Sequence, residues 1–280
     1  TLPGILESRG YSAFFLYSGP TYFEGLHSIL ENSGFTVFNK EYFETSMPQR
    51  KYKSFSWGVD DAALLHKTAQ ILPDLKGPSL FIIGFSSTHS PYFNPDPEKF
   101  SRHDNESEKG RYLNCIDYNM FIMDNIIKLF LQYNDNTIFI ILGDHGESFG
   151  DQGFLRHGFS LFNTEIKVPF YIRHPVFSDA PVYTAGTILD IYPSLLDMLG
   201  IETPAPMHGK SFFCEDYKLN LFLRSWKEGE NMGFLSEGNK FIYSRKNDRF
   251  IELDLQDNII REITDHEEKN NFRNFLNSNY

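Results

Sequence analysis

The chain has 280 residues, of which 41% are hydrophobic, enough for one large α/β domain or a domain with a small subdomain. Its formal net charge is −11 with no block of basic residues, which argues against nucleic acid as a partner because phosphate neutralisation needs clustered Lys and Arg. The two cysteines, Cys115 and Cys214, lie far apart without metal-site spacing, and both a disulfide and two free thiols remain open.

Short apolar runs alternate with amphipathic segments up to about residue 200, which predicts a sheet wrapped by helices. The run 136–143 is short, apolar and rich in β-branched residues, as in a parallel strand that is buried on both faces. The longest predicted helix covers residues 111–133, where apolar positions recur every three or four residues. The other predicted strands are 12–17, 35–38, 79–85 and 167–172, and the other predicted helices are 1–9, 23–32, 60–72 and 187–199.

The pattern changes from about residue 221, where short strand-like runs are joined by turns and followed by a last helix over 267–276. We therefore expect an α/β portion over residues 1–215 and a small antiparallel subdomain over residues 216–280. No run in the sequence reaches the roughly 18 apolar residues of a transmembrane helix, and no signal peptide is recognisable.

The polar cluster Asp144-His145-Gly146-Glu147 begins where the predicted strand 136–143 ends. Ligands of open α/β sheets bind at the carboxyl ends of the strands, and a carboxylate beside an imidazole suits Zn²⁺ or Mn²⁺. The alternative is that Asp144 caps the following segment and His145 is an ordinary loop histidine. Glu147 is interpreted as a solvated acid rather than as a metal ligand or a base.

Two more histidines stand beside predicted strands. His89 follows strand 79–85, and His157 lies in the loop that leads to strand 167–172. If these strands and strand 136–143 are parallel neighbours, the three loops meet at one edge of the sheet. They could then hold one or two metal ions, or one metal ion with a phosphate group.

Two further side chains have a chemical and a structural interpretation. Arg156 directly precedes His157 and could contact an anionic group of a substrate. Trp57 is interpreted as a packing residue rather than as a substrate contact.

These residues together resemble the alkaline-phosphatase superfamily, and within it the sulfatase-like enzymes with the lipoteichoic-acid synthases and the phosphoethanolamine or phosphoglycerol transferases. The resemblance covers nearly the whole chain, and the order of the motifs is more specific than any one of them. The motifs are Trp57-Gly-Val-Asp-Asp61, Ser87-Thr-His-Ser-Pro91, Gly143-Asp-His-Gly-Glu147, His157-Gly158 and Val168-Pro169.

The resemblance implies an α/β sandwich, an alkaline-phosphatase-like sheet flanked by helices, with a divalent metal (Zn, Mn, Ca or Mg) at the carboxyl end of the sheet. It implies that Asp144 and His145 ligate this metal and that His157 binds an additional zinc or the substrate. It also implies that His89 contacts the transferred phosphoryl or sulfuryl group, with Arg156 as a further substrate contact.

The implied chemistry is displacement at phosphorus or sulfur by a Thr, Ser or formylglycine, followed by transfer to water or an alcohol. In the family, the nucleophile and an acidic ligand precede the stretch that Thr1 begins here, so we expect neither in this chain and expect the fragment itself to be inactive. Phe23 and Gly25 fall where the lipoteichoic-acid branch has a Trp and an Arg that grip phosphoglycerol, which argues against glycerol-phosphate specificity.

The resulting hypothesis is a metal-dependent phosphoryl- or sulfuryl-ester hydrolase or transferase that acts on an envelope lipid or glycan. It would work at the extracytoplasmic face of a bacterial inner membrane, attached through an N-terminal segment outside this chain. One alternative is a non-catalytic binding or regulatory domain that kept the fold. Another is a membrane-tethered interaction domain whose loop over residues 91–109 meets a partner.

Overall fold

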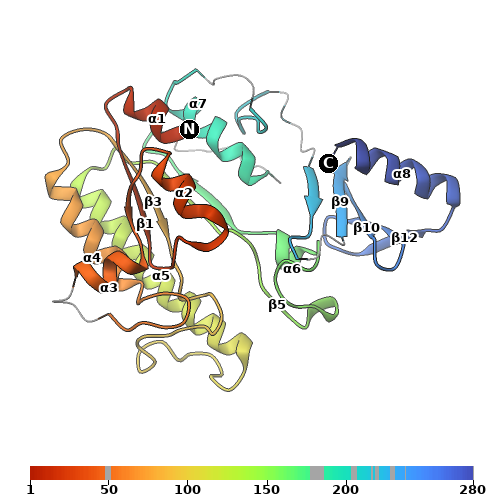
Figure 1. Cartoon of the computed structure of the whole chain (residues 1–280), viewed down its shortest axis with the longest axis horizontal. Helices are drawn as coiled ribbons and strands as arrows, with labels where there is room; N and C mark the ends of the chain where they lie inside the picture. Colours follow the sequence, from red (N-terminus) through yellow and green to blue (C-terminus); the bar gives the residue numbers. More distant parts are fainter. Residues whose placement is uncertain are drawn as a thin grey trace. The chain divides into compact units, whose positions relative to one another are not determined.

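The computed structural model describes residues 1–47, 52–176, 186–202, 207–215, 217, 221–227, 231–236 and 238–279. Contacts within the chain divide it into two compact units, Thr1–Thr137 and Ile138–Tyr280, which are described separately below (Figure 1). This division falls at residue 137, whereas our expected boundary lies at residue 215, and that domain boundary stays a prediction.

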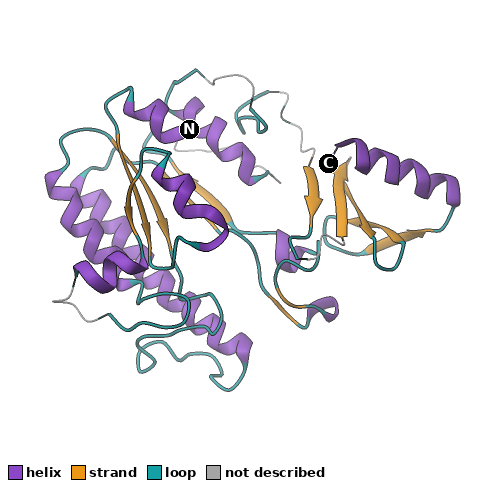
Figure 2. Ribbon diagram, viewed as in Figure 1, coloured by secondary structure: helices purple, strands orange, loops and turns teal. Residues whose placement is uncertain are grey.

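The first unit is built on a three-stranded parallel sheet in the order β2-β1-β3. Its strands are β1 (Ser12–Tyr17), β2 (Thr36–Phe38) and β3 (Ser79–Gly84), which confirms the three strands predicted for this part of the chain. The ribbon shows α2 on one side of this sheet and α4 and α5 on the other (Figure 2). The helices of the unit are α1 (Leu2–Glu7), η1 (Phe23–Gly25), α2 (Leu26–Glu31), α3 (Lys40–Ser46), α4 (Ala62–Ile71), η2 (Leu72–Asp74) and α5 (Glu108–Tyr133).

The core of the first unit lies between β1 and the helices α3, α4 and α5. It contains Leu16 from β1, Phe43 from α3, Leu64 from α4 and Ile122 from α5, all of them buried. Helix α3 was not expected from the sequence, although Asn39 caps it by accepting the backbone N–H of Tyr42 at 3.1 Å.

The second unit begins with β4 (Phe139–Leu142), which pairs antiparallel with β7 (Phe170–Arg173). The strand around β4 was expected to be buried on both faces and parallel to its neighbours; both expectations are wrong, because β4 is half-buried and runs antiparallel to β7. The apolar run indicated a strand but carried no information on direction. A parallel connection needs a long crossover, usually a helix, and the described segment between these strands has only short elements.

Those short elements are β5 (Ser148–Phe149), η3 (Asp151–Gly153), β6 (Leu155–Arg156) and α6 (Asn163–Ile166). Strands β5 and β6 form a small antiparallel hairpin in which Ser148 lies opposite Arg156. Further along the chain, η4 (Ile188–Asp190) leads into α7 (Ile191–Met198), which confirms the helix predicted over residues 187–199.

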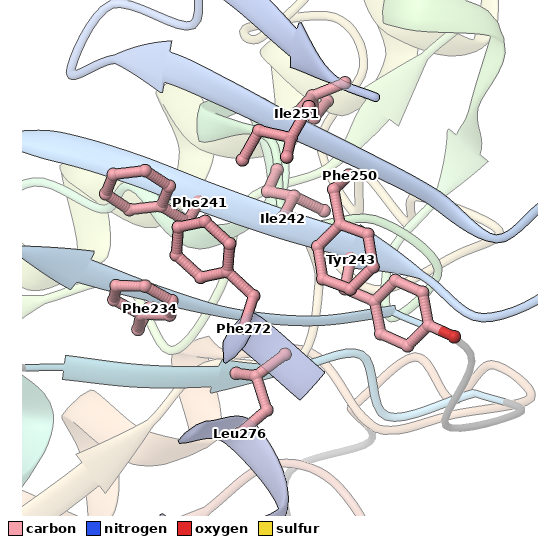
Figure 3. A pocket seen from close by; sticks show the side chains of 9 residues that line it. Phe234, Phe241, Ile242, Tyr243, Phe250, Ile251, Phe272 and Leu276 are labelled. Carbon is pink, nitrogen blue, oxygen red and sulfur yellow. The ribbon is translucent and has the colours of Figure 1, made fainter. Parts of the chain in front are cut away.

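The second unit ends in a five-stranded antiparallel sheet with the order β12-β11-β10-β9-β8, which confirms the predicted C-terminal sheet. Helix α8 (His266–Asn279) packs on it through Phe272 and Leu276. Figure 3 shows that aromatic and aliphatic side chains line the pocket between sheet and helix; the Tyr243 hydroxyl is the one polar side-chain group of this lining and bonds to Asp248, so we assign the pocket to the core. The strands are β8 (Leu221–Arg224), β9 (Asn231–Ser236), β10 (Asn239–Ser244), β11 (Arg249–Asp254) and β12 (Ile259–Ile263).

The two cysteines are free thiols, with Cys115 buried on α5 and Cys214 exposed. Of the two arrangements left open by the sequence, the structure therefore has the unpaired one. Among the helices that the structure describes, none has the length and apolar character that crossing a bilayer requires.

Candidate functional site

The turn that follows β4 holds Asp144 and His145 side by side. The Asp144 Oδ1 atom accepts the backbone N–H of His145 at 2.9 Å, and Asp144 Oδ2 lies 3.6 Å from His145 Nε2. The His145 ring donates from Nδ1 to the Gly146 carbonyl oxygen at 2.9 Å. This bond keeps the ring proton on Nδ1 and the lone pair on Nε2, the nitrogen on the side of Asp144.

The spacing of these two donors fits a shared cation. Two ligand atoms about 2.1 Å from a tetrahedral zinc ion stand about 3.4 Å apart, close to the separation of Asp144 Oδ2 and His145 Nε2. Both side chains are also accessible, with exposed fractions of 89% for Asp144 and 42% for His145. Within the ranges that the structure describes, however, no group of three or more His, Cys, Asp or Glu residues is arranged to hold a metal ion. A metal site made by Asp144, His145 and His157 therefore stays a prediction.

His157 is brought to this turn by the β5–β6 hairpin. Because Ser148 pairs with Arg156, the residues just outside the hairpin, Glu147 and His157, face each other. The His157 ring donates from Nδ1 to Glu147 Oε2 at 3.0 Å, and its centroid lies 4.0 Å from that of His145. The antiparallel course of β4 and β7 thus still places the two imidazoles together at one end of the strand pair.

Glu147 is a buried carboxylate, with an exposed fraction of 5% for its side chain, so the expectation of a solvated acid is wrong. One oxygen, Oε2, accepts from His157, and the other, Oε1, is buried without a hydrogen-bond partner among the described residues. A buried carboxylate oxygen is normally satisfied by a donor, a proton or a cation. The hairpin turn between Phe149 and Leu155, marked by two glycines, was the sequence signal that could have predicted this pairing.

Arg156 occupies a half-buried position on β6 with a positive φ of 73°. The interaction of Arg156 with an anionic group of a substrate stays a prediction.

In the first unit, His89 follows β3 as the sequence predicted. Its ring lies flat on the indole of Trp57, with the centroids 4.0 Å apart and the planes 6° from parallel, and its Nδ1 donates to the Ser90 carbonyl oxygen at 2.8 Å. Trp57 in turn donates from Nε1 to the Tyr17 hydroxyl at 3.1 Å. Trp57 is a packing residue, as expected, but what it packs against is the histidine of the predicted site.

The loop that carries His89 is tied to β1 by Asp61. The Ser86 and Ser87 backbone N–H groups donate to the two carboxylate oxygens of Asp61 at 3.0 and 3.1 Å, and the Ser18 hydroxyl, just after β1, donates to Oδ1. Burial raises the pKa of Asp61, and these hydrogen bonds partly oppose that shift. A side chain at Gly58 would collide with this arrangement, because a Cβ there would lie 2.2 Å from Ser86 Oγ.

The His89 group belongs to the first unit and the His145–His157 group to the second. The convergence of all three histidines at one edge of the sheet therefore stays a prediction.

The sequence is similar to a known protein family and to curated proteins of related activity. A family model described as sulfatase matches residues 1–201. The chain belongs to the sulfatase family. It is 27% identical over 174 residues to the phosphoethanolamine transferase EptA of Salmonella typhimurium, a match that covers 51% of this chain and 32% of EptA.

Two solved structures show the fold of this sulfatase-family chain. A protein of the alkaline phosphatase superfamily from Vibrio parahaemolyticus superimposes with a TM-score of 0.73 at 20% identity, covering 96% of this chain and 64% of that chain. The lipoteichoic acid synthase LtaP from Listeria monocytogenes superimposes with a TM-score of 0.69 at 15% identity, covering 99% of this chain and 71% of that chain.

These comparisons confirm the predicted superfamily and the alkaline-phosphatase-like fold with its C-terminal antiparallel sheet. The family and its relatives support a function in sulfate- or phosphate-ester chemistry. The chain spans about a third of the length of EptA and less than two thirds of the Vibrio protein.

Proposed function

We propose that the intact protein is a metal-dependent hydrolase or transferase of phosphoryl or sulfuryl esters, with an envelope lipid or glycan as its substrate. The observation that supports it best is the pairing of Asp144 and His145 at a spacing that suits a divalent cation, next to a second imidazole, His157, that is oriented by the buried Glu147. Zn, Mn, Ca and Mg are the candidate metals.

In this proposal Asp144 and His145 hold the cation, which supplies charge to offset the negative charge that develops on the transferred group. Glu147 accepts the Nδ1 proton of His157 and so orients the ring with Nε2 toward its ligand or substrate. His89, held flat by Trp57, contacts the transferred group, and Arg156 contacts an anionic part of the substrate. By resemblance to the family, the attacking group of the intact protein is a Thr, Ser or formylglycine.

The resemblance to phosphoethanolamine transferases and lipoteichoic-acid synthases supports a place at the extracytoplasmic face of a bacterial inner membrane. There the ester group would belong to a lipid-linked or glycan molecule of the envelope. Fractionation of cells that express the intact protein, followed by protease treatment of spheroplasts, tests this placement.

The test of activity uses the intact protein, nitrophenyl phosphate and nitrophenyl sulfate esters, and each candidate metal in turn. Replacing Asp144 and His145 together by Ala should lower metal-dependent turnover by about a hundredfold or more, because both proposed ligands are lost. His266→Ala is the matched control, since His266 lies at the start of α8 and bonds to Asn270. Equal activity of the wild-type and double-Ala proteins would contradict the proposal.

A second candidate function is a non-catalytic binding or regulatory domain. It is favoured by the high exposure of Asp144 and by the lack of a three-ligand group in the described parts of the chain. Binding of an ester by the intact protein without turnover, in the presence of every candidate metal, would support this alternative.

A further inference from the structure

Helix α6, only four residues long, lies against the turn that carries His145 and Glu147. Its Glu165 carbonyl oxygen accepts the backbone N–H of Gly146 at 2.8 Å, and its Thr164 hydroxyl oxygen accepts a hydrogen bond from the Ser148 side-chain hydroxyl at 3.1 Å. The approach is close, because a Cβ on Gly146 would lie 2.1 Å from the Thr164 carbonyl oxygen. The position of α6 therefore sets the position of this turn.

The same helix also holds the segment after His157. The buried carboxylate of Glu165 accepts the backbone N–H groups of Phe159 and Ser160 at 3.0 and 3.2 Å, and the Ser160 hydroxyl at 2.6 Å. The turn that carries His145 is thus bonded to the backbone of α6, and the segment after His157 is bonded to the side chain of Glu165 on the same helix.

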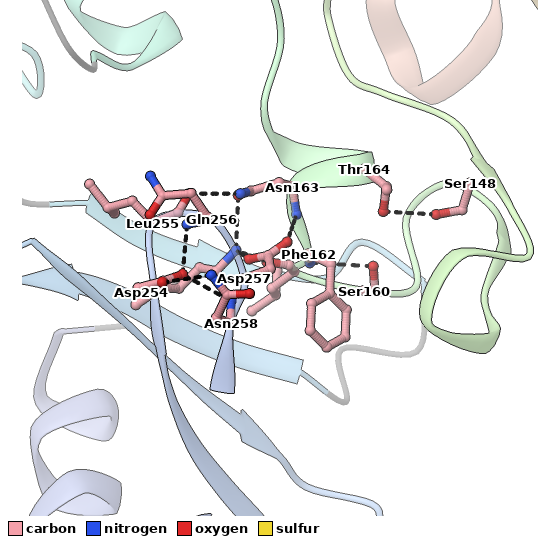
Figure 4. A network of polar contacts seen from close by, with 12 residues as sticks. Ser148, Ser160, Phe162, Asn163, Thr164, Asp254, Leu255, Gln256, Asp257 and Asn258 are labelled. Atoms are coloured by element: carbon pink, nitrogen blue, oxygen red, sulfur yellow. Dashed lines mark hydrogen bonds and ion pairs between the residues drawn. The ribbon is translucent and has the colours of Figure 1, made fainter. Parts of the chain in front are cut away.

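The other side of α6 is fastened to the C-terminal sheet by a buried ion pair. Lys240 on β10, with an exposed fraction of 1%, donates from Nζ to the Leu161 carbonyl oxygen and to Asn163 Oδ1, both at 3.0 Å, and it is ion-paired with Asp257. Asp257 accepts the backbone N–H of Asn163, whose side-chain amide donates to the Leu255 carbonyl oxygen at 2.8 Å. Figure 4 shows Asn163, the first residue of α6, facing the turn over residues 254–258.

We infer that Lys240 and Asp257 are positioning residues for the proposed active site. Through α6 they set the turn over residues 144–147 and the segment over residues 157–160, so the C-terminal sheet acts as a scaffold for the two histidines. A buried ion pair adds little net stability compared with apolar residues of the same size, but it demands one arrangement of its partners. Here those partners include the carbonyl of Leu161 and both the backbone and the side chain of Asn163.

This inference rests on the proposed function, and its test separates the two. The variant is Lys240→Met with Asp257→Asn, because removing one charge alone leaves the other buried and unpaired. Asn suits position 257, where φ is 69°. The control is Arg261→Met, which removes other ion pairs of the same sheet, those of Arg261 with Glu252 on β11 and with Glu268 on α8.

The first measurement is hydrogen–deuterium exchange of the Gly146 amide, which does not depend on activity. We expect the Gly146 amide to exchange about tenfold faster in the double variant, because the loss of the ion pair loosens α6. In the control we expect exchange at the wild-type rate, because α6 keeps its contacts there. The second is turnover of a nitrophenyl ester by the intact protein, where we expect kcat to fall about tenfold or more with little change in KM.

A folded double variant with wild-type exchange at Gly146 overturns the inference. If the double variant does not fold, Asn163→Ala replaces it, since it cuts the side-chain bonds to Lys240 and Leu255 and leaves the ion pair in place. A wild-type protein with no ester activity removes the proposed function, and the exchange of Gly146 then still decides whether Lys240 and Asp257 position the turn.

Discussion

Trp57 and His89 form a parallel stack, with ring centroids 4.0 Å apart, that joins the segment before α4 to the loop after β3. The His89 ring is held on a second side by the bond from Nδ1 to the Ser90 carbonyl oxygen. An imidazole fixed in this way presents Nε2 in one direction, which is what contact with a transferred phosphoryl or sulfuryl group requires. The stack therefore leads to a prediction about Trp57, a residue with no reactive group of its own.

Replacing Trp57 by Ala in the intact protein should lower kcat by about tenfold, because His89 loses the surface that orients it. Replacing it by Phe should cost much less, since a phenyl ring can still stack on imidazole. Steady-state kinetics on a nitrophenyl ester measures both, with thermal unfolding as a check on folding. Equal losses in the Ala and Phe variants would show that the stack does not orient His89.

Glu147 should matter through the hydrogen bond that it accepts from His157. Replacing Glu147 by Gln keeps an acceptor oxygen but removes the charge, and it should weaken binding of the metal to the intact protein by about tenfold, as for other carboxylate–histidine pairs. Replacing it by Leu also removes the acceptor and should weaken binding further. Calorimetric titration with Zn²⁺ and Mn²⁺ ranks the two variants, and the reverse order would contradict this role.

The local elements of the chain could be predicted from its sequence because their signals are local. Strand β1 (Ser12–Tyr17) coincides with its predicted range, since a short run of aromatic and aliphatic residues bounded by Gly10 and Gly19 has few other conformations available. Helix α3 was not predicted, because its hydrophobic stripe is short and the clearest sequence signal of its start is the single capping residue Asn39.

The arrangement of the site could be predicted only in part. Asp144 and His145 were found because they follow an apolar strand directly, whereas the bond between Glu147 and His157 depends on the register of a two-residue hairpin. The direction of β4 relative to β7 depends on what connects them, and an apolar run does not report it. The role of Lys240 could not be foreseen, because a lysine on a strand is ordinarily solvated and its partners lie far away in the sequence.

Asp61 should make a pH-dependent contribution to stability. Burial raises its pKa above the ordinary value of 3.8, although hydrogen bonds from Ser18, Ser86 and Ser87 partly oppose the shift. The native state then keeps a proton that the unfolded state releases, so the contribution is fully present below about pH 4 and is lost as the pH rises through the raised pKa.

Asp61→Asn tests this contribution, because an amide nitrogen cannot accept the N–H groups that now reach both oxygens. We expect the free energy of unfolding to fall by about 1–3 kcal/mol, most at low pH and less as the pH rises. Urea unfolding at several pH values measures it. Asp60→Asn is the control, since the contacts of Asp60 with Tyr118 and Ala62 use a single oxygen that Asn retains. A deficit that grows with pH would contradict the raised pKa.

The two cysteines should differ sharply in reactivity. Burial, with a smaller effect from the charge of Asp61, raises the pKa of Cys115 to about 12, whereas Cys214 is exposed. At pH 8 only about one Cys115 in ten thousand is a thiolate, and the thiolate is the reactive form. Titration with Ellman's reagent should therefore detect one thiol in the native chain and two in guanidinium chloride. The Cys214→Ser variant should show none until it unfolds, and rapid reaction of its native form would mean that Cys115 is not buried as the structure shows.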